Sequence, residues 1–304
     1  MSKPYPGDWV LRSVLFVPGH IEPMMKKGAD TDADCVILDL EDAVPADWKL
    51  TARKKARRIL DEGVYAKKTV FVRINALQTS LSTEDIAAVA CGSLNGFVYP
   101  RANCAEDLQR LDSQLGSTEE DLQLPSGHFS LITVIETTRA MLNVRAVAEA
   151  SPRIVALIFG CEDFLADLQG RHSDGDIALL APRAQVALAA RAIGAEPIDT
   201  PYVRVGDLDG LRRFAETGRD LGMAGMCALT PRQVDIVNEV YTPSAEEAQS
   251  ARQVIEAAEN PADSDRGVFI AEGKFISPPT VKAARKTISR HEAICNLQKF
   301  YQKV

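Results

Sequence analysis

The stretch SLITVIETTRAMLNVRAVAEASPRIVALIFGCEDFLADLQG (130–170) holds two short apolar runs, each followed by a helical pattern. The runs SLITVI (130–135) and RIVALIF (153–159) are almost continuously apolar, which is typical of strands buried on both faces. The segment between them, residues 137–150, has helical character. Two buried strands joined by a helix form a βαβ unit, so this stretch predicts a parallel sheet.

The same alternation extends in both directions along the chain. Further strands are predicted at 10–17, 35–40, 69–74, 96–100, 202–205 and 223–229, and further helices at 22–30, 47–62, 82–91, 104–115, 178–194 and 208–221. Eight strands alternating with helices is the count of an α/β fold of the (β/α)8 TIM-barrel type. The alternative is a doubly wound open sheet, but that fold would need a GxGxxG-type turn after an early strand, and the sequence has none.

The pattern changes after residue 242. We therefore predict a TIM-barrel catalytic domain at 1–242 and a C-terminal helical lid or oligomerisation extension at 243–304. Within the extension, TPSAEEAQSARQVIEAAE (242–259) predicts an amphipathic helix, VFIAEGKFIS (268–277) a short hairpin, and residues 278–304 a long basic helix. The extension is expected either to cap the barrel or to reach a neighbouring subunit.

Composition excludes several classes of protein. A net charge of −7 argues against a nucleic-acid binder, which needs a basic face. No apolar run approaches the roughly 18–20 residues of a membrane span, and MSKPYPGDWVLRS (1–13) lacks the apolar segment of a secretory signal. The six cysteines form no CxxC pair, which favours reduced thiols and a cytoplasmic location.

Two acidic residues follow the two strands of the opening stretch. Glu136 comes directly after the first, and Asp163 lies just after the second. Parallel strands place their carboxyl ends at one edge, so we expect the two carboxylates side by side. Acids that stabilise a helix dipole are the alternative. Two acids at matching positions favour a metal site instead, with Mg²⁺ the best fit and Mn²⁺ possible. We find no His and Cys cluster beside them, which argues against zinc.

An arginine stands inside the otherwise apolar run TVFVRI (69–74). Buried, the Arg73 guanidinium needs a carboxylate partner from the protein or from a substrate. In CVILDLEDAV (35–44), Asp39 and Glu41 lie on one side of an extended strand, with Asp42 just beyond. One interpretation is an internal salt bridge between Arg73 and Glu41 or Asp39. The other is that Arg73 holds a substrate carboxylate or polarises a carbonyl, while the acids fix its orientation.

Six motifs in order carry a resemblance to a known family. RSVLFVPGH, CVILDLEDAV, VFVRINAL, VIETTRAMLN, FGCEDFLADL and VNEVYTPSAEEA, between Arg12 and Ala248, resemble the citrate lyase beta-subunit-like family, which includes malyl-CoA and citramalyl-CoA lyases. The resemblance implies a Mg²⁺-dependent TIM barrel that cleaves or forms a C–C bond next to an acyl thioester. It also implies a keto acid and an acyl-CoA as ligands, and a homotrimer or homohexamer as the assembly.

The resemblance also implies roles for single residues. Glu136 and Asp163 match the metal ligands, and Arg73 matches the arginine that contacts the substrate. The acids Asp39, Glu41 and Asp42 match a catalytic cluster near the metal, and the remaining substrate contacts are expected from Glu136, Phe16 and Lys27.

Three positions depart from the family pattern. The chain reads VPGHIEP (17–23) where many relatives read VPGNRPE, and LTP (229–231) where they read IHP. In EGKFIS (272–277), Ser277 stands where the CoA lyases carry an aspartate acid/base group, and a hydroxyl is a poor proton carrier near neutral pH. The alternative is a shifted alignment in which Glu272 or another acid fills this role. The expected activity is a Mg²⁺-dependent lyase for a β-hydroxy dicarboxylic acyl-CoA such as citramalyl-CoA or malyl-CoA. The alternatives are a CoA-independent keto-acid aldolase and a non-catalytic barrel that binds a keto acid or CoA.

Overall fold

The computed structural model describes residues 9–173, 175–260, 267–271 and 273–302. The chain falls into two compact units, Met1–Tyr241 and Thr242–Val304. In the described residues, no helix combines the length and the hydropathy needed to cross a bilayer. All six cysteines are free thiols, in agreement with the sequence-based prediction.

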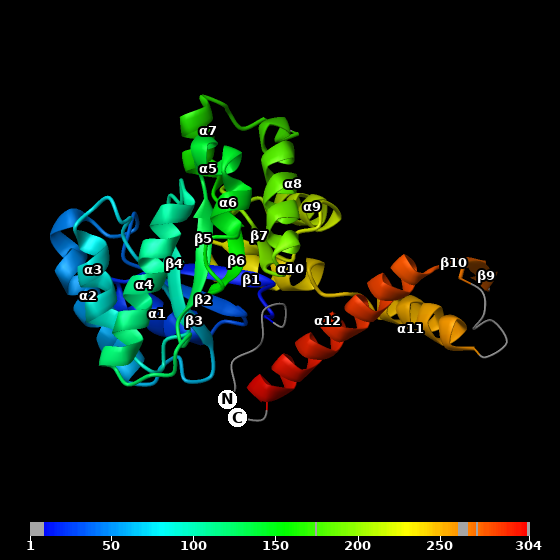
Figure 1. Cartoon of the computed structure of the whole chain (residues 1–304), viewed down its shortest axis with the longest axis horizontal. Coiled ribbons are helices and arrows are strands. Elements are labelled where there is room, and N and C mark those ends of the chain that lie inside the picture. The colour runs from blue at the N-terminus through cyan, green and yellow to red at the C-terminus, as the bar shows by residue number, and fades with distance from the viewer. Residues whose placement is uncertain (1–8, 174, 261–266, 272, 303–304) are drawn as a thin grey trace. The chain divides into compact units, whose positions relative to one another are not determined.

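The first unit is a closed barrel of parallel strands in chain order, which confirms the predicted TIM-barrel fold (Figure 1). The first strand pairs with the second and also with the eighth, and this last pairing closes the sheet. The strands are β1 (Ser13–Pro18), β2 (Cys35–Asp39), β3 (Thr69–Arg73), β4 (Gly96–Tyr99), β5 (Ser130–Ile135), β6 (Ile154–Phe159), β7 (Glu196–Asp199) and β8 (Gly225–Ala228).

Helices surround this barrel. They are α1 (Glu22–Ala29), α2 (Lys49–Asp61), α3 (Leu81–Val89), α4 (Ala105–Asp121), α5 (Thr138–Leu142), α6 (Val144–Ala148), α7 (Cys161–Leu168), α8 (Ile177–Ala192), α9 (Leu208–Asp220) and α10 (Pro231–Val240), with a short 3-10 helix η1 (Ala46–Trp48) before α2. The helix predicted at 137–150 is divided into α5 and α6 at Asn143.

The strands are apolar on both faces because each face meets a different part of the core. In β3, Phe71 belongs to the cluster inside the barrel, whereas Val70 and Val72 pack in the layer between strands and helices. Successive side chains of a strand point to opposite faces, so a strand in such a barrel needs apolar residues at consecutive positions.

The prediction of a strand at 202–205 was wrong. The seventh strand is β7, with the sequence EPID, and residues 202–205 form a loop before α9. The sequence pattern does not identify β7 as a strand, because proline and acidic residues are uncommon in central strands. Pro197 pairs with Leu157 of β6, and the acids at both ends of β7 have arginine partners.

One of these partners is the buried Arg183 of α8. Its Nε donates to Asp199 Oδ1 at 3.0 Å, and its Nη2 donates to the Phe214 carbonyl at 2.8 Å. The guanidinium also stacks on the Phe214 ring, 3.9 Å from the ring centre. This ion pair therefore joins α8, β7 and α9 inside the helix layer.

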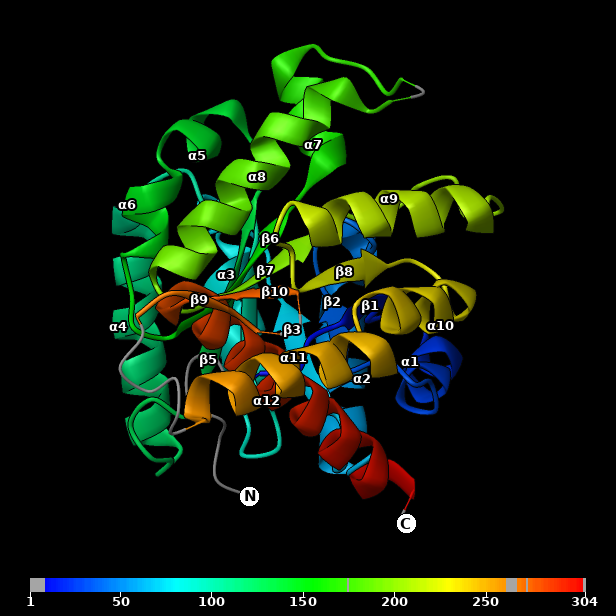
Figure 2. The ribbon, with the colours of Figure 1, turned by 90° about the vertical axis from the view of Figure 1, so that its right-hand side faces the viewer.

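The second unit contains α11 (Ala245–Glu259), β9 (Phe269–Ala271), β10 (Lys274–Ile276) and α12 (Pro278–Gln302). α11 lies against α12 (Figure 2). The predicted hairpin is confirmed by antiparallel pairing of β9 with β10, although Glu272 at its turn lies outside the described residues. Ser277 precedes α12, where its amide donates to Thr280 Oγ1 at 2.8 Å.

Candidate active site at the carboxyl ends of the strands

Arg73, the last residue of β3, is held by carboxylates from the end of β2 and the loop after it. Its Nε donates to Asp39 Oδ1 at 2.7 Å and its Nη2 donates to Asp39 Oδ2 at 2.5 Å. Its Nη1 lies 3.1 Å from Glu41 Oε2, and the guanidinium carbon lies 5.1 Å from the centre of the Phe16 ring. The internal salt bridge considered from the sequence is therefore present.

The carboxylate of Asp39, which orients this arginine, is itself held by backbone amides. Asp39 also accepts the backbone amides of Glu41 at 2.8 Å and Ala43 at 3.1 Å, so its carboxylate cannot rotate freely. Of the five N–H groups of a guanidinium, two of Arg73 donate to Asp39 and at most one is directed at Glu41. Two N–H groups remain that a ligand could accept from.

Lys49 of α2 stabilises the loop that carries Glu41. Its Nζ donates to the carbonyls of Leu40 and Glu41, both at 2.7 Å, and to Asn75 Oδ1 at 2.8 Å. Because these acceptors follow β2 and β3, the lysine ties together the ends of two neighbouring strands.

Glu136 follows β5 and is only 4% exposed. Its Oε1 accepts the backbone amide of Arg101 at 2.6 Å. Gly160 leaves space for this side chain, because a Cβ at position 160 would lie 2.7 Å from Glu136 Cβ and 2.8 Å from its Oε2. Any larger residue at 160 would displace the carboxylate.

Sequence reasoning missed Arg101. Its backbone is left-handed, with φ of 51°, and this conformation directs its amide toward Glu136. Its guanidinium lies 3.4 Å from Asp163 Oδ1 and 3.9 Å from Glu41 Oε1. The available signal was its position directly after YP at the end of a predicted strand, the same position that singled out the other site residues.

The site contains more acidic than guanidinium groups. When its four carboxylates (Asp39, Glu41, Glu136 and Asp163) are all ionised, they exceed the two guanidinium groups (Arg73 and Arg101) by two negative charges. Burial, together with the charge of Glu41, raises the pKa of Glu136 to about 8. Burial raises the pKa of Glu41 to about 7, although Arg73 opposes this change.

In its ionised form, a cluster with two excess negative charges suits a divalent cation. Glu136 and Asp163 together offer carboxylate oxygens, the ligands that Mg²⁺ prefers. Asp163 lies in the first turn of α7 with 42% of its side chain exposed, which leaves room for water or substrate oxygens in the coordination shell. The residues present therefore fit the predicted magnesium ion.

The structure does not bring every predicted residue into this cluster. Asp42, the residue after Glu41, is exposed. It acts on Glu41 only electrostatically, and its negative charge helps to raise the pKa of Glu41. Lys27 is exposed in the last turn of α1 and forms no ion pair with another described residue. The helix that follows a barrel strand runs back toward the opposite rim, so that turn points away from the site.

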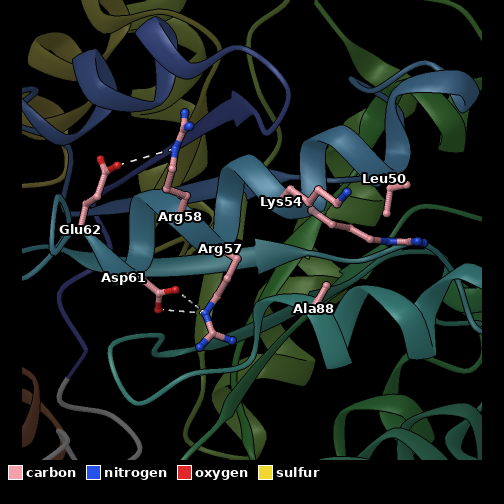
Figure 3. Close-up of a pocket in the computed structure, with 8 residues that line it drawn as sticks. Leu50, Lys54, Arg57, Arg58, Asp61, Glu62 and Ala88 are labelled. Atoms are coloured by element: carbon pink, nitrogen blue, oxygen red, sulfur yellow. Dashed lines mark hydrogen bonds and ion pairs between the residues drawn. The ribbon is translucent and has the colours of Figure 1, made fainter.

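A separate surface pocket lies between α2 and α3 (Figure 3). Arg57 and Arg58 of α2 line it, and each is paired with an acid one turn later, Asp61 at 2.8 Å and Glu62 at 3.6 Å. Its charges are largely paired by the protein, unlike those of the barrel site.

Comparison with known proteins finds a matching family and similar chains. The HpcH/HpaI aldolase/citrate lyase family matches residues 12–231. A (3S)-malyl-CoA thioesterase of Cereibacter sphaeroides is 33% identical over 93% of this chain and 95% of its own length. The citrate lyase subunit beta of Escherichia coli is 31% identical over 92% of this chain and 93% of its own length.

Solved structures are also similar to this chain. The CitE protein of Mycobacterium tuberculosis, in complex with magnesium, acetoacetate and coenzyme A, matches with a TM-score of 0.73 and 28% identity. The match covers 92% of this chain and 97% of that one.

Proposed function

Because the chain belongs to the HpcH/HpaI aldolase/citrate lyase family, we propose that it is a Mg²⁺-dependent carbon–carbon lyase. Its proposed substrate is a small β-hydroxy dicarboxylic acyl-CoA of the malyl-CoA or citramalyl-CoA type. The observation that carries this proposal is the pair Glu136 and Asp163, with its excess negative charge, beside an arginine that is rigidly held but has two free N–H groups.

The chemistry follows from these groups. In cleavage, the substrate hydroxyl loses its proton and the bond between the hydroxyl-bearing carbon and the α carbon breaks. The electron pair passes to the thioester enolate, which takes up a proton, so that a keto acid and an acyl-CoA are released. A magnesium ion held by Glu136 and Asp163 would supply positive charge to the substrate oxygens. Arg73 donates to the oxygen that becomes the keto carbonyl and stabilises the charge that develops there.

We assign the proton transfer to Glu41. By the resemblance, Ser277 stands at the position of the family's tail aspartate. Its hydroxyl lies 3.3 Å from Thr280 Oγ1 and is a poor acid. Glu41 Oε2 forms an ion pair with Arg73 Nη1 at 3.1 Å but accepts no hydrogen bond among the described residues. Burial raises its pKa to about 7, which suits a group that must both accept and donate a proton near neutral pH.

A second candidate function is hydrolysis of the thioester. A (3S)-malyl-CoA thioesterase is 33% identical over almost the whole chain, so thioester cleavage is represented among relatives of this similarity. Hydrolysis would release free CoA, whereas C–C cleavage alone releases a keto acid and leaves the thioester intact.

The test is a product assay. The full-length protein with Mg²⁺ is incubated with malyl-CoA, citramalyl-CoA and citryl-CoA, while keto acid and free thiol are measured separately. We expect keto acid to form from at least one substrate, at least 100-fold more slowly in Glu136→Gln and Asp163→Asn. Glu149→Gln, which changes an exposed acid after α6, is the control and should retain activity. Free thiol without keto acid would favour the thioesterase instead.

The two alternative functions and the role of Arg73 are tested by binding and turnover measurements. Keto-acid binding without turnover of any thioester would favour the non-catalytic barrel, and turnover of a free hydroxy acid would favour the CoA-independent aldolase. In calorimetry, Arg73→Ala should weaken oxaloacetate or glyoxylate binding much more than Mg²⁺ binding. Equal keto-acid affinity before and after the change would exclude the assigned role of Arg73.

We also propose that residues 243–304 serve as a lid or an oligomerisation extension in a trimer or hexamer. The hairpin of this unit exposes Ile270 and Phe275, which are 75% and 59% exposed. Light scattering of the full chain and of Ile270→Asp/Phe275→Asp tests the oligomerisation role. We expect the variant to lose its assembly.

A further inference from the structure

Cys161, Glu162 and His172 form a cluster beyond the end of β6. Cys161 Sγ lies 3.4 Å from Glu162 Oε1, and His172 Nε2 lies 2.7 Å from the same oxygen. One ligand atom from each residue lies within 4.8 Å of the others. The first two residues begin α7, and the histidine comes from the loop between α7 and α8.

A second carboxylate orients the histidine from behind. His172 Nδ1 lies 3.3 Å from Asp176 Oδ1. Asp176 is the N-cap residue of α8, yet its side chain accepts no capping hydrogen bond, and its backbone is left-handed with φ of 43°. Its other oxygen lies 3.5 Å from Arg204 Nη2. A carboxylate on one imidazole nitrogen, with the other nitrogen facing ligand groups, is the usual support of a metal-binding histidine.

We propose that Cys161, Glu162 and His172 bind a zinc-like divalent cation at a site distinct from the Glu136–Asp163 pair. A thiolate, a carboxylate and a neutral imidazole balance two positive charges, and water would complete a tetrahedral shell.

The spacing of the ligand atoms fits such a site. Bonds of about 2.0–2.3 Å at tetrahedral angles place ligand atoms roughly 3.3–3.7 Å apart. The distance between Cys161 Sγ and Glu162 Oε1 is 3.4 Å, within that range. The distance between His172 Nε2 and Glu162 Oε1 is 2.7 Å, because a hydrogen bond joins them, and a cation would replace that proton. Sulfur and imidazole ligands select zinc-like ions over Mg²⁺.

This site revises the argument against zinc made from the sequence. Cys161 and His172 are separated by ten residues of helix and loop, so no short ligand motif marks them. The folding of the loop between α7 and α8 brings them together. The competing explanation is a protonated His172 that bridges two acids. Burial opposes protonation, but Glu162 and Asp176 outweigh it and raise the pKa of His172.

Cobalt titration of the metal-free, full-length protein distinguishes the two explanations. In excess Mg²⁺, we expect one Co²⁺ per chain with a thiolate charge-transfer band and the strong visible absorption of a tetrahedral ion. Zn²⁺ should abolish both signals by displacement. Cys161→Ser and His172→Ala should each remove the charge-transfer band or weaken Co²⁺ binding at least 100-fold.

Two controls make this result specific. Cys295→Ser should keep the band, although Cys295 Sγ also lies near a histidine, 3.7 Å from His291 Nε2. Glu136→Gln and Asp163→Asn should keep it too, and they separate this site from the proposed lyase centre. Asp176→Asn should weaken Co²⁺ binding about 10–100-fold while the shape of the spectrum is retained.

Three results would overturn the proposal. They are no thiolate band in the wild-type protein, an unchanged band in both Cys161→Ser and His172→Ala, or displacement of Co²⁺ by Mg²⁺. Circular dichroism confirms that each variant is folded. If Cys161→Ser does not fold, His172→Ala decides the question alone, because its partly exposed side chain can be removed without opening the core.

Discussion

Arg101 shows how one residue can organise several charges. Its left-handed backbone places its amide on Glu136, while its side chain reaches Asp163 and Glu41. Residues other than glycine adopt this conformation at a cost of about 1 kcal/mol or more, and such strain is often found at functional sites.

A comparison of two variants measures this strain. Arg101→Ala should be less stable than Arg101→Gly by about 1 kcal/mol, because glycine adopts a positive φ without steric cost and alanine does not. Urea unfolding gives the difference. Gln123, an exposed residue after α4 with φ of 55°, is the matched control and should show the same order for Ala and Gly. Equal stability of the two Arg101 variants would contradict a strained backbone.

The pKa of Glu136 predicts how stability changes with pH. The folded carboxyl has a pKa raised to about 8, whereas an unfolded glutamate titrates at about 4.3. Between these values the folded state holds a proton that the unfolded state has lost. The free energy of unfolding of the metal-free protein should therefore fall as pH rises through this range.

Glu136→Gln removes this contribution. The stability of the variant relative to the wild type should rise by at least about 1 kcal/mol between pH 5.5 and pH 8. Urea unfolding in the presence of a chelator measures it. Parallel pH profiles for the two proteins would show that Glu136 is already ionised in the folded state.

At the scale of elements, β7 and α8 depend on each other. Asp199 and Arg183 are both fully buried, with Nη2 of the arginine at hydrogen-bonding distance from the carboxylate. Removal of one member of a buried pair leaves an uncompensated charge, which is far more costly than loss of a surface pair.

Arg183→Met should accordingly destabilise the protein by about 3–5 kcal/mol. The double variant Arg183→Met/Asp199→Asn should recover part of that loss, because no unpaired charge remains. Arg212→Met is the control, since Arg212 and Glu239 form an exposed pair at 2.6 Å, and it should cost no more than about 1 kcal/mol. Denaturant unfolding of the set gives all three values, and similar losses for the two single variants would contradict the argument.

The same elements show what the sequence can and cannot predict. β3 and β5 are predictable because both of their faces meet apolar neighbours, so the residue pattern alone identifies them. β7 is not, because Glu196 and Asp199 find their partners on α8, and that contact exists only in three dimensions. Because the carboxyl ends of parallel strands meet at one edge, the sequence alone could bring Glu136 and Arg73 to one site. No sequence pattern predicts the left-handed backbone conformation of Arg101.

At the scale of the whole barrel, closure of the sheet brings charged side chains from several strands together. The side chains of the site come from the ends of β2 to β6, which are far apart in sequence but adjacent around the sheet. Each position contributes one or two charges, and only the closed sheet produces the excess of negative charge that suits a divalent cation.

Binding of that cation should stabilise the protein. At a free Mg²⁺ concentration of about 100 times Kd, the free energy of unfolding should increase by about 2.7 kcal/mol. KCl at matched ionic strength should not reproduce the increase. Asp163→Asn should remove most of it, and thermal unfolding provides the measurement. A stabilisation of the same size in Asp163→Asn would place the magnesium ion elsewhere.

The close packing around Gly160 predicts which substitutions can occur at this position in nature. Every missense change there adds a Cβ within 2.8 Å of Glu136, whereas the neighbourhood of Gly206 is empty within 4 Å. In a mutational scan with growth coupled to turnover, codon 160 should tolerate only synonymous changes, while codon 206 should accept many residues. The site thus imposes a selective constraint on a residue that takes no part in the chemistry, and population sequences would record it.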